Sequence, residues 1–225
     1  MKKIFVALMA IALVGLFSCK KENLDDQNQN QTPTDTTSHG GEPAAVNPFL
    51  GSWDMMFVEG ASVHMTVTFS ESLRTIMTLA GQEAPEDMDQ DVSMEGTLLG
   101  FVVEEGSGNQ LNVTGSMTVN LGMGDPVTFS FNTTATYANG TMSIEPAEIS
   151  ETITVANAIP IDLTGTITFT QPTAAPVEDN LSIELATMSI NGSGTLTYQG
   201  MSIANAVAVT VNGSNLPANG TRAEE

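Results

Sequence analysis

Residues 111–121 read LNVTGSMTVNL, and the pattern in this stretch decides the fold. Apolar or small residues fall at every second position: Leu111, Val113, Gly115, Met117, Val119 and Leu121. Successive side chains of a β-strand point to opposite faces, so a period of two indicates a strand with one buried face and one solvated face. Such strands are typical of antiparallel sheets.

The same alternation returns along the chain, at 63–69 (VHMTVTF), 127–131 (VTFSF), 161–169 (IDLTGTITF) and 207–211 (VAVTV). Asn-Gly pairs at 139–140, 191–192 and 212–213 follow runs of this kind, and we expect hairpin turns there. Only residues 70–79 could form a helix, although the TIMTL part of this segment fits a strand equally well. The pattern predicts about ten or eleven strands.

Residues 47–216 are enough for one domain with a hydrophobic core. We predict an all-β domain over 47–216, folded as an antiparallel up-and-down barrel, with a β-sandwich as the alternative. A polar C-terminal tail is expected at 217–225. Glycines such as Gly115 and Gly165 interrupt alternating strands, and they indicate bends or close backbone approaches of the kind found at barrel corners.

Residues 47–57 read NPFLGSWDMMF and place Gly51 two positions before Trp53, the only tryptophan. This G-x-W pattern resembles the one that opens lipocalins and the lipocalin-like domains of bacterial lipoproteins. The resemblance implies a lipocalin-like barrel in which Trp53 closes one end beneath an arginine of the last strand. That arginine is missing from the predicted last strand, because Arg222 lies in the expected tail. A lone tryptophan that caps the core of another sandwich is the alternative.

The chain opens with Lys2 and Lys3, followed by an apolar run at 4–17 and the only cysteine, Cys19. A basic start and a short apolar run are typical of a secretory signal peptide, whereas a membrane-spanning helix needs about 20 apolar residues. Residues 16–19 (LFSC) resemble the lipobox of bacterial lipoproteins. The resemblance implies a signal peptide at 1–18 and acylation of Cys19, since two or more acyl chains anchor a protein stably. A free thiol in a discarded leader is the alternative.

The residues that follow Cys19 are Lys20, Lys21 and Glu22, with two aspartates shortly after them. They resemble the start of lipoproteins sent to the outer face of some Gram-negative outer membranes. The resemblance implies an outer-membrane location, and we favour the cell surface over the periplasmic face. Residues 19–46 are rich in Gln, Asn, Thr and Pro, which predicts a lipidated flexible linker.

Cleavage of the signal peptide would leave four basic residues against 26 acidic ones, a balance of −22. A chain of this charge is repelled by phosphate backbones, so we exclude nucleic acid as a partner.

Few residues of the predicted domain suggest chemistry. His64 is its one histidine, and no nucleophile or phosphate-binding motif is present, so we predict no enzyme and no cofactor. Asp87, Asp89 and Asp91 imitate the start of an EF-hand loop, but the glycine and the final glutamate of that loop are missing. They predict a charged, solvated loop or a weak calcium site. Arg74 is the only basic residue of 47–216, suited to an ion pair or to the anionic head of a ligand.

The expected role is non-catalytic binding of a small apolar or amphipathic molecule inside the barrel, with Trp53 and Arg74 as candidate contacts. Methionine suits such a promiscuous interior, although it also serves as core filler. The alternative is a structural or adhesive cell-envelope protein that acts through protein–protein contacts. The two roles differ in whether the inward side chains leave a cavity of at least about 300 Å³, the lower range of ligand pockets.

Overall fold

The computed structural model describes residues 47–224, with gaps at 123–124, 156–158 and 199. The predicted signal peptide at 1–18, the linker at 19–46 and Cys19 therefore lie outside the described residues.

The described residues form twelve strands and one helix, which confirms the all-β prediction. The elements are β1 (Gly51–Phe57), β2 (Ser62–Phe69), α1 (Glu71–Leu79), β3 (Met88–Ser93), β4 (Leu98–Glu105), β5 (Gln110–Val119), β6 (Val127–Ala138), β7 (Thr141–Ile144), β8 (Ala147–Val155), β9 (Ile159–Phe169), β10 (Thr173–Ala174), β11 (Asn180–Tyr198) and β12 (Met201–Arg222).

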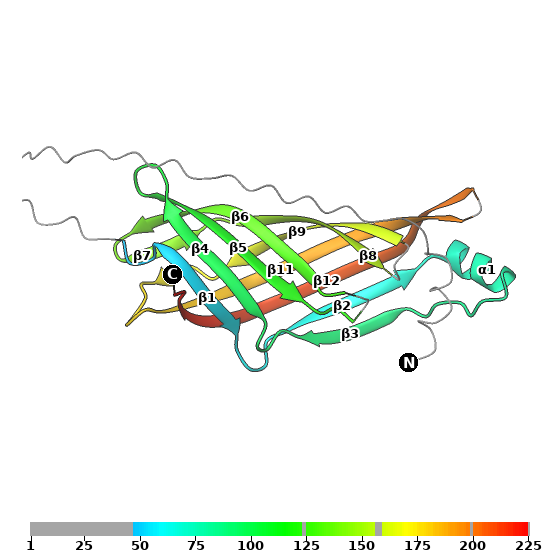
Figure 1. Cartoon of the computed structure of the whole chain (residues 1–225), viewed down its shortest axis with the longest axis horizontal. Helices are drawn as coiled ribbons and strands as arrows, with labels where there is room; N and C mark the ends of the chain where they lie inside the picture. The colour runs from blue at the N-terminus through cyan, green and yellow to red at the C-terminus, as the bar shows by residue number, and fades with distance from the viewer. Residues whose placement is uncertain (1–46, 123–124, 156–158, 199, 225) are drawn as a thin grey trace, which may run out of the picture. The chain divides into compact units, whose positions relative to one another are not determined.

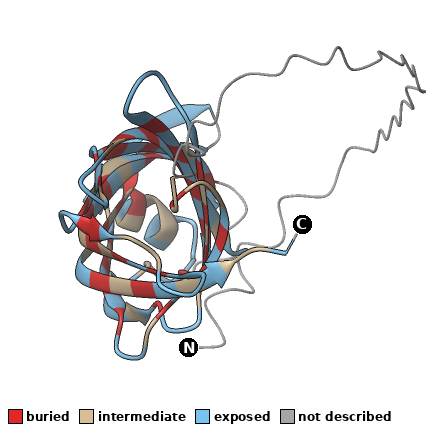
Figure 2. Cartoon of the chain, turned by 90° about the vertical axis from the view of Figure 1, so that its left-hand side faces the viewer, coloured by how far each residue is buried: buried red, intermediate tan, exposed pale blue. Residues whose placement is uncertain are grey.

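Eight of the strands close into a ring (Figures 1 and 2). Their order is β1-β4-β5-β6-β8-β9-β11-β12, and β1 pairs with β12 to complete the circuit. All the pairings are antiparallel. The chain passes from β1 to β4 through the β2–β3 hairpin, in which β2 follows β1 and β3 precedes β4. The chain therefore winds up and down around a barrel, and the β-sandwich alternative does not apply.

The longest strand, β12, holds the barrel together along one side. Its residues 218–222 pair with β1 and its residues 207–213 pair with β2, while β11 pairs with it on the opposite side. The polar tail predicted at 217–225 is therefore wrong, because β12 continues to Arg222. Ala218, within the expected tail, is fully buried in the barrel wall.

The barrel interior is filled by the alternating apolar side chains. Buried and exposed residues alternate along the strands, visible as bands in Figure 2. Each of the eight ring strands contributes at least one inward residue with 0% exposure: Met55, Phe101, Val113, Phe129, Ala147, Leu163, Ile190 and Val211. A void that could hold water would expose the side chains that line it, so these residues have no such space beside them.

The turn predictions were right at one Asn-Gly pair and wrong at two. Asn139 and Gly140 both have positive φ, 53° and 78°, and form the tight turn between β6 and β7. The pairs at 191–192 and 212–213 instead lie inside β11 and β12 and face each other's strand in the ladder. Gly192 is required there for another reason, because a Cβ atom would lie 2.2 Å from the carbonyl oxygen of Asp162.

Helix α1 covers one end of the barrel. It begins after Ser70, whose hydroxyl accepts a hydrogen bond from the backbone N–H of Leu73 at 3.2 Å, an N-cap that terminates β2 and starts the helix. Figure 1 places α1 next to the end of β2, on the same side of the molecule as the joined ends of β11 and β12, and Figure 2 places it within the outline of the ring. Leu73 is buried and packs against the core at this end.

Candidate functional site

At the end of the barrel opposite α1, Trp53 of β1 is the register partner of Arg222 in β12. Trp53 is 1% exposed, and its indole N–H donates a hydrogen bond to the carbonyl oxygen of Phe49 at 2.8 Å. The guanidinium of Arg222 lies over the indole, with its central carbon 4.4 Å from the ring centroid. This geometry is a cation–π contact.

Arg222, which was expected in a C-terminal tail, lies in the last strand. Its Nε donates to the carboxylate of Asp179 at 3.1 Å, and its two Nη atoms donate to the carbonyl oxygens of Pro48, at 3.1 Å, and Leu50. Gly51 has a φ of 117°, and a Cβ atom there would lie 2.7 Å from the guanidinium. Glycine thus provides both the backbone conformation and the space that the guanidinium requires.

Arg74 fastens α1 to the end of β2. Its Nε donates to the carbonyl oxygen of Phe69 at 3.2 Å, and its Nη1 donates to that of Pro85 at 2.8 Å. Its Nη2 donates to the carboxylate of Asp87 at 2.6 Å, and the same carboxylate oxygen accepts from the backbone N–H of Phe69 at 2.8 Å. These contacts occupy every nitrogen of the guanidinium, which favours the ion-pair role over a ligand-binding role.

Part of the acidic stretch is a strand rather than the predicted loop, because β3 begins at Met88, one residue after Asp87. Asp89 and Asp91 lie in β3 beside His64 of β2, and His64 and Asp91 are direct register partners. The imidazole Nε2 of His64 lies 2.8 Å from Asp89, and its Nδ1 lies 3.0 Å from Asp91. His64 is therefore held between two carboxylates on the solvent face of the β2–β3 hairpin.

The carboxylates change the titration of His64. The side-chain hydrogen bond to Asp91 is the main cause that raises the pKa of His64 above its usual value of 6.5, and the charges of Asp89 and Asp91 add to this effect. A raised pKa means that the imidazolium is favoured in the fold. Its contribution to stability is complete below pH 6.5 and is lost as the pH rises through the higher pKa of the folded state.

We expect an NMR titration of the His64 ring protons to give a pKa above 6.5. The Asp91→Asn variant should lower this pKa, because the neutral amide removes a charge and the acceptor that stabilises the imidazolium. Glu95→Gln, on the same hairpin region but without a contact to His64, is the control and should leave the pKa unchanged. An unshifted pKa in the wild-type protein would show that the carboxylates do not hold the ring in solution.

No group of three or more His, Cys, Asp or Glu side chains that could hold a metal ion occurs among the described residues. Asp87 faces Arg74, whereas Asp89 and Asp91 face His64, so the three aspartates have cationic or hydrogen-bonding partners from the protein itself. The weak calcium site predicted at these residues gains no support from this arrangement.

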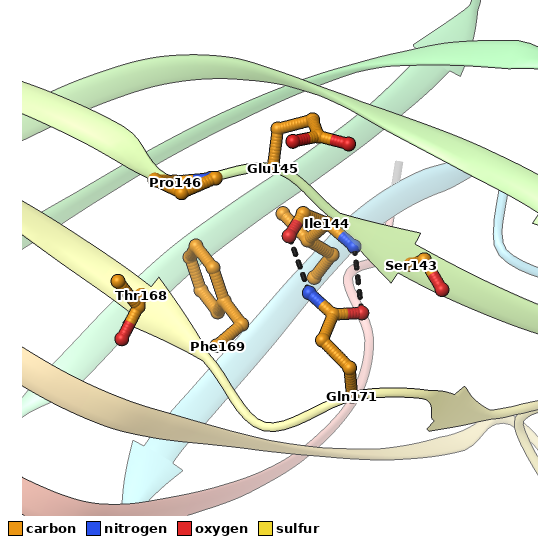
Figure 3. A pocket seen from close by; sticks show the side chains of 7 residues that line it. All are labelled: Ser143, Ile144, Glu145, Pro146, Thr168, Phe169 and Gln171. Carbon is orange, nitrogen blue, oxygen red and sulfur yellow. Dashed lines mark hydrogen bonds between the residues drawn. The ribbon is translucent and has the colours of Figure 1, made fainter.

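Two hollows lined by described residues lie in the barrel wall. The first has a volume of about 310 Å³ and lies between β7 and β9 (Figure 3). There the side chain of Gln171 takes the place of a neighbouring strand: the backbone N–H of Ile144 donates to Gln171 Oε1 at 3.0 Å, and Gln171 Nε2 donates to the carbonyl oxygen of Ile144. The lining residues are Ser143, Ile144, Glu145, Pro146, Thr168, Phe169 and Gln171.

The second hollow, of about 280 Å³, lies between β6 and β8. None of the eight inward residues named above, which are fully buried, lines either hollow. The buried methionines belong to this filling: Met55, Met65, Met94, Met117, Met142 and Met188 are each 1% exposed or less. These six methionines therefore serve as core filler.

No helix among the described residues has the length and apolar character needed to cross a membrane. Comparisons with protein-family models, with curated proteins and with solved structures found no match.

Proposed function

We propose that this chain is a non-catalytic lipoprotein of the outer membrane, anchored through acyl groups on Cys19, whose barrel acts through its outer surface in contacts with other proteins. The observation that carries the proposal is the filled interior, in which all eight ring strands place fully buried side chains. Because a barrel without interior space cannot enclose a ligand, recognition must take place on its outer surface. The LFSC sequence at 16–19 and the short apolar run before it support the anchor.

The outer surface favours a partner that carries positive charge. The described residues include 20 carboxylates, whereas Arg74 and Arg222 are the only lysine or arginine residues after residue 46. Both arginines already bind carboxylates and backbone carbonyl groups of the protein. The resulting field attracts cationic surfaces and repels nucleic acid.

Part of this charge is held in fixed positions on neighbouring strands. The carboxylate of Asp162 on β9 accepts a hydrogen bond from Thr152 at 2.8 Å, and that of Glu184 on β11 accepts one from Thr170 at 3.1 Å. Glu148 on β8 lies 3.4 Å from the hydroxyl of Thr166. Threonine hydroxyls thus orient the outward carboxylates, which reduces the entropy that these side chains would lose on binding.

The experiment that tests the proposal uses the full chain in cells. The wild-type protein should fractionate with membranes and carry a lipid mass, and Cys19→Ala should lose both properties. Chemical cross-linking on intact cells should then join the wild-type protein to a protein partner, and adduct formation should fall at high salt. An unacylated wild-type protein would contradict the anchor, and its accessibility to external protease would decide between the cell surface and the periplasmic face.

Matched variants test the surface itself. Glu148→Gln, Asp162→Asn and Glu184→Gln combined should abolish the adduct, whereas Glu83→Gln combined with Glu104→Gln, a neutralisation elsewhere on the protein, should preserve it. Equal adduct from both variants would overturn the charged contact surface. An apolar molecule released by solvent from the purified protein, and found bound in native mass spectrometry, would instead favour the alternative of a ligand inside the barrel.

A further inference from the structure

The barrel wall is incompletely paired between β6 and β8. Among the described residues, these two strands share a single register pair, Asn132 with Glu148, whereas β5–β6 and β8–β9 pair along the length of the shorter strand. The second hollow is lined by the start of β6 and the end of β8.

Glu151 is an inward-phase residue at this opening. It lies two residues from Ile149 and from Ile153 on β8 and therefore shares their face of the strand, and both isoleucines are buried in the core. Its carboxylate Oε1 accepts a hydrogen bond from the backbone N–H of Ser130 on β6 at 3.3 Å, in place of the missing ladder bond. A glutamate in the apolar phase of a barrel strand therefore lies where the wall is open.

The hollow combines this carboxylate with apolar walls. Five of the lining residues present aliphatic surface, namely Leu121, Pro126, Val127, Ile153 and Val155. The others are polar or acidic: Asp125, Thr128, Glu151, Thr152 and Thr154. A polar group set in apolar walls is typical of small-molecule sites, and the volume of about 280 Å³ limits the ligand to a small one.

The charge of the hollow selects the sign of the ligand. No lysine, arginine or histidine is among the lining residues, and no ion pair with Glu151 is found among the described residues. An ionised carboxylate can accept about four hydrogen bonds, so the bond from Ser130 leaves capacity for a further donor. A cationic donor forms the stronger, charge-assisted bond.

We propose that the hollow between β6 and β8 binds a primary alkylammonium ion, with the ammonium group on the carboxylate of Glu151 and the alkyl chain against Val127, Ile153 and Val155. At about 30 Å³ for each heavy atom, the volume that liquid water occupies, a four-carbon chain with its ammonium group fills about half the hollow. The inference goes beyond the proposed protein contacts, and the two can fail independently.

The test titrates n-butylammonium chloride into the isotopically labelled full chain in a non-ionic detergent and follows the backbone amides by NMR. We expect saturable shifts at Thr128, Thr152 and Ile153, with a dissociation constant on the order of 1–10 mM for this site. n-Butanol, which lacks the charge, and ammonium chloride, which lacks the chain, should each give at least about tenfold weaker binding. Equal shifts with either control would overturn the proposal without the need for a variant.

The variants separate the carboxylate from the general charge of the protein. Glu151→Gln should weaken butylammonium binding by about tenfold or more, whereas Glu104→Gln, an exposed residue of β4, should change it less than about twofold. Equal binding by the wild-type protein and Glu151→Gln would overturn the assignment. A free alkylamine and the side chain of a lysine carry the same ammonium group. If Nα-acetyl-lysine methylamide shifts the same backbone amides, the hollow binds a lysine of a partner protein. If it gives no shifts while n-butylammonium binds, the ligand is a free amine.

Discussion

Replacing Trp53 with alanine is expected to lower the free energy of unfolding by about 3–5 kcal/mol, the range observed for large-to-alanine changes of buried aromatic residues. Trp53 is 1% exposed, so the substitution leaves a cavity at the closed end of the barrel. It also removes the ring beneath Arg222 and the hydrogen bond to Phe49. The effect therefore combines lost apolar burial, an empty space and the loss of two specific contacts.

Urea unfolding followed by circular dichroism is the appropriate measurement, because the variant lacks the only tryptophan of the chain. Met201→Ala is the control: Met201 is 54% exposed, and its truncation should change the free energy of unfolding by less than about 0.5 kcal/mol. Arg222→Ala should fall between the two, since it spares the apolar packing of the indole. A loss below about 1 kcal/mol for Trp53→Ala would contradict the role of this end as part of the core.

The fold class could be predicted from the sequence because a local pattern of alternating apolar residues identifies the buried face of each strand. Val113, Met117 and Val119 alternate with polar residues, and they lie on the inner face of β5 as predicted. The apolar residues of 70–79 fit a helix or a strand equally well. The Ser70 cap is the feature that makes residues 71–79 a helix. Local alternation does not predict whether the sheet closes into a barrel, because closure depends on pairing between β1 and β12.

Pairing across long sequence distances is also why the site predictions were less successful. Trp53 and Arg222 are register partners, but Arg222 was expected in a polar tail instead of a strand. Asp87, Asp89 and Asp91 suggested a metal-binding loop because no local pattern shows their partners. The β2–β3 register brings His64 beside Asp89 and Asp91, and α1 brings Arg74 beside Asp87. Each missed contact joins residues that no local pattern connects.

Glu151 is different, because a local signal for it was present. The sequence AEISETITV at 147–155 places glutamate in phase with Ile149, Ile153 and Val155. A charged residue in the apolar phase of a strand indicates either a bend in the strand or an opening in the wall. In β8 the glutamate marks the opening in the wall. The departure from alternation thus pointed to a candidate site, whereas regular alternation indicates only the fold.

Replacing Gly165 with alanine is the second change with a large expected effect, about 1–3 kcal/mol of destabilisation from overpacking. Gly165 lies in β9, in register with Ile149 of β8 and Ile190 of β11. A Cβ atom there would lie 2.2 Å from the carbonyl oxygen of Ser189 and 2.6 Å from the Cα of Ile190. Both are backbone atoms, so no side-chain rotation can relieve the clash and the β9–β11 ladder itself must move.

Gly100→Ala provides the matched control, since Gly100 is also a strand glycine of the ring. A Cβ atom at Gly100 would lie 3.4 Å from the hydroxyl oxygen of Ser116, a side-chain atom that can rotate, and 3.8 Å from its carbonyl oxygen. Urea unfolding should therefore show a change within about 0.5 kcal/mol for this variant. Equal stability of Gly100→Ala and Gly165→Ala would mean that β9 and β11 do not approach closely at Gly165. A loss confined to Gly165→Ala indicates that glycine is required there for the close approach of two curved strands.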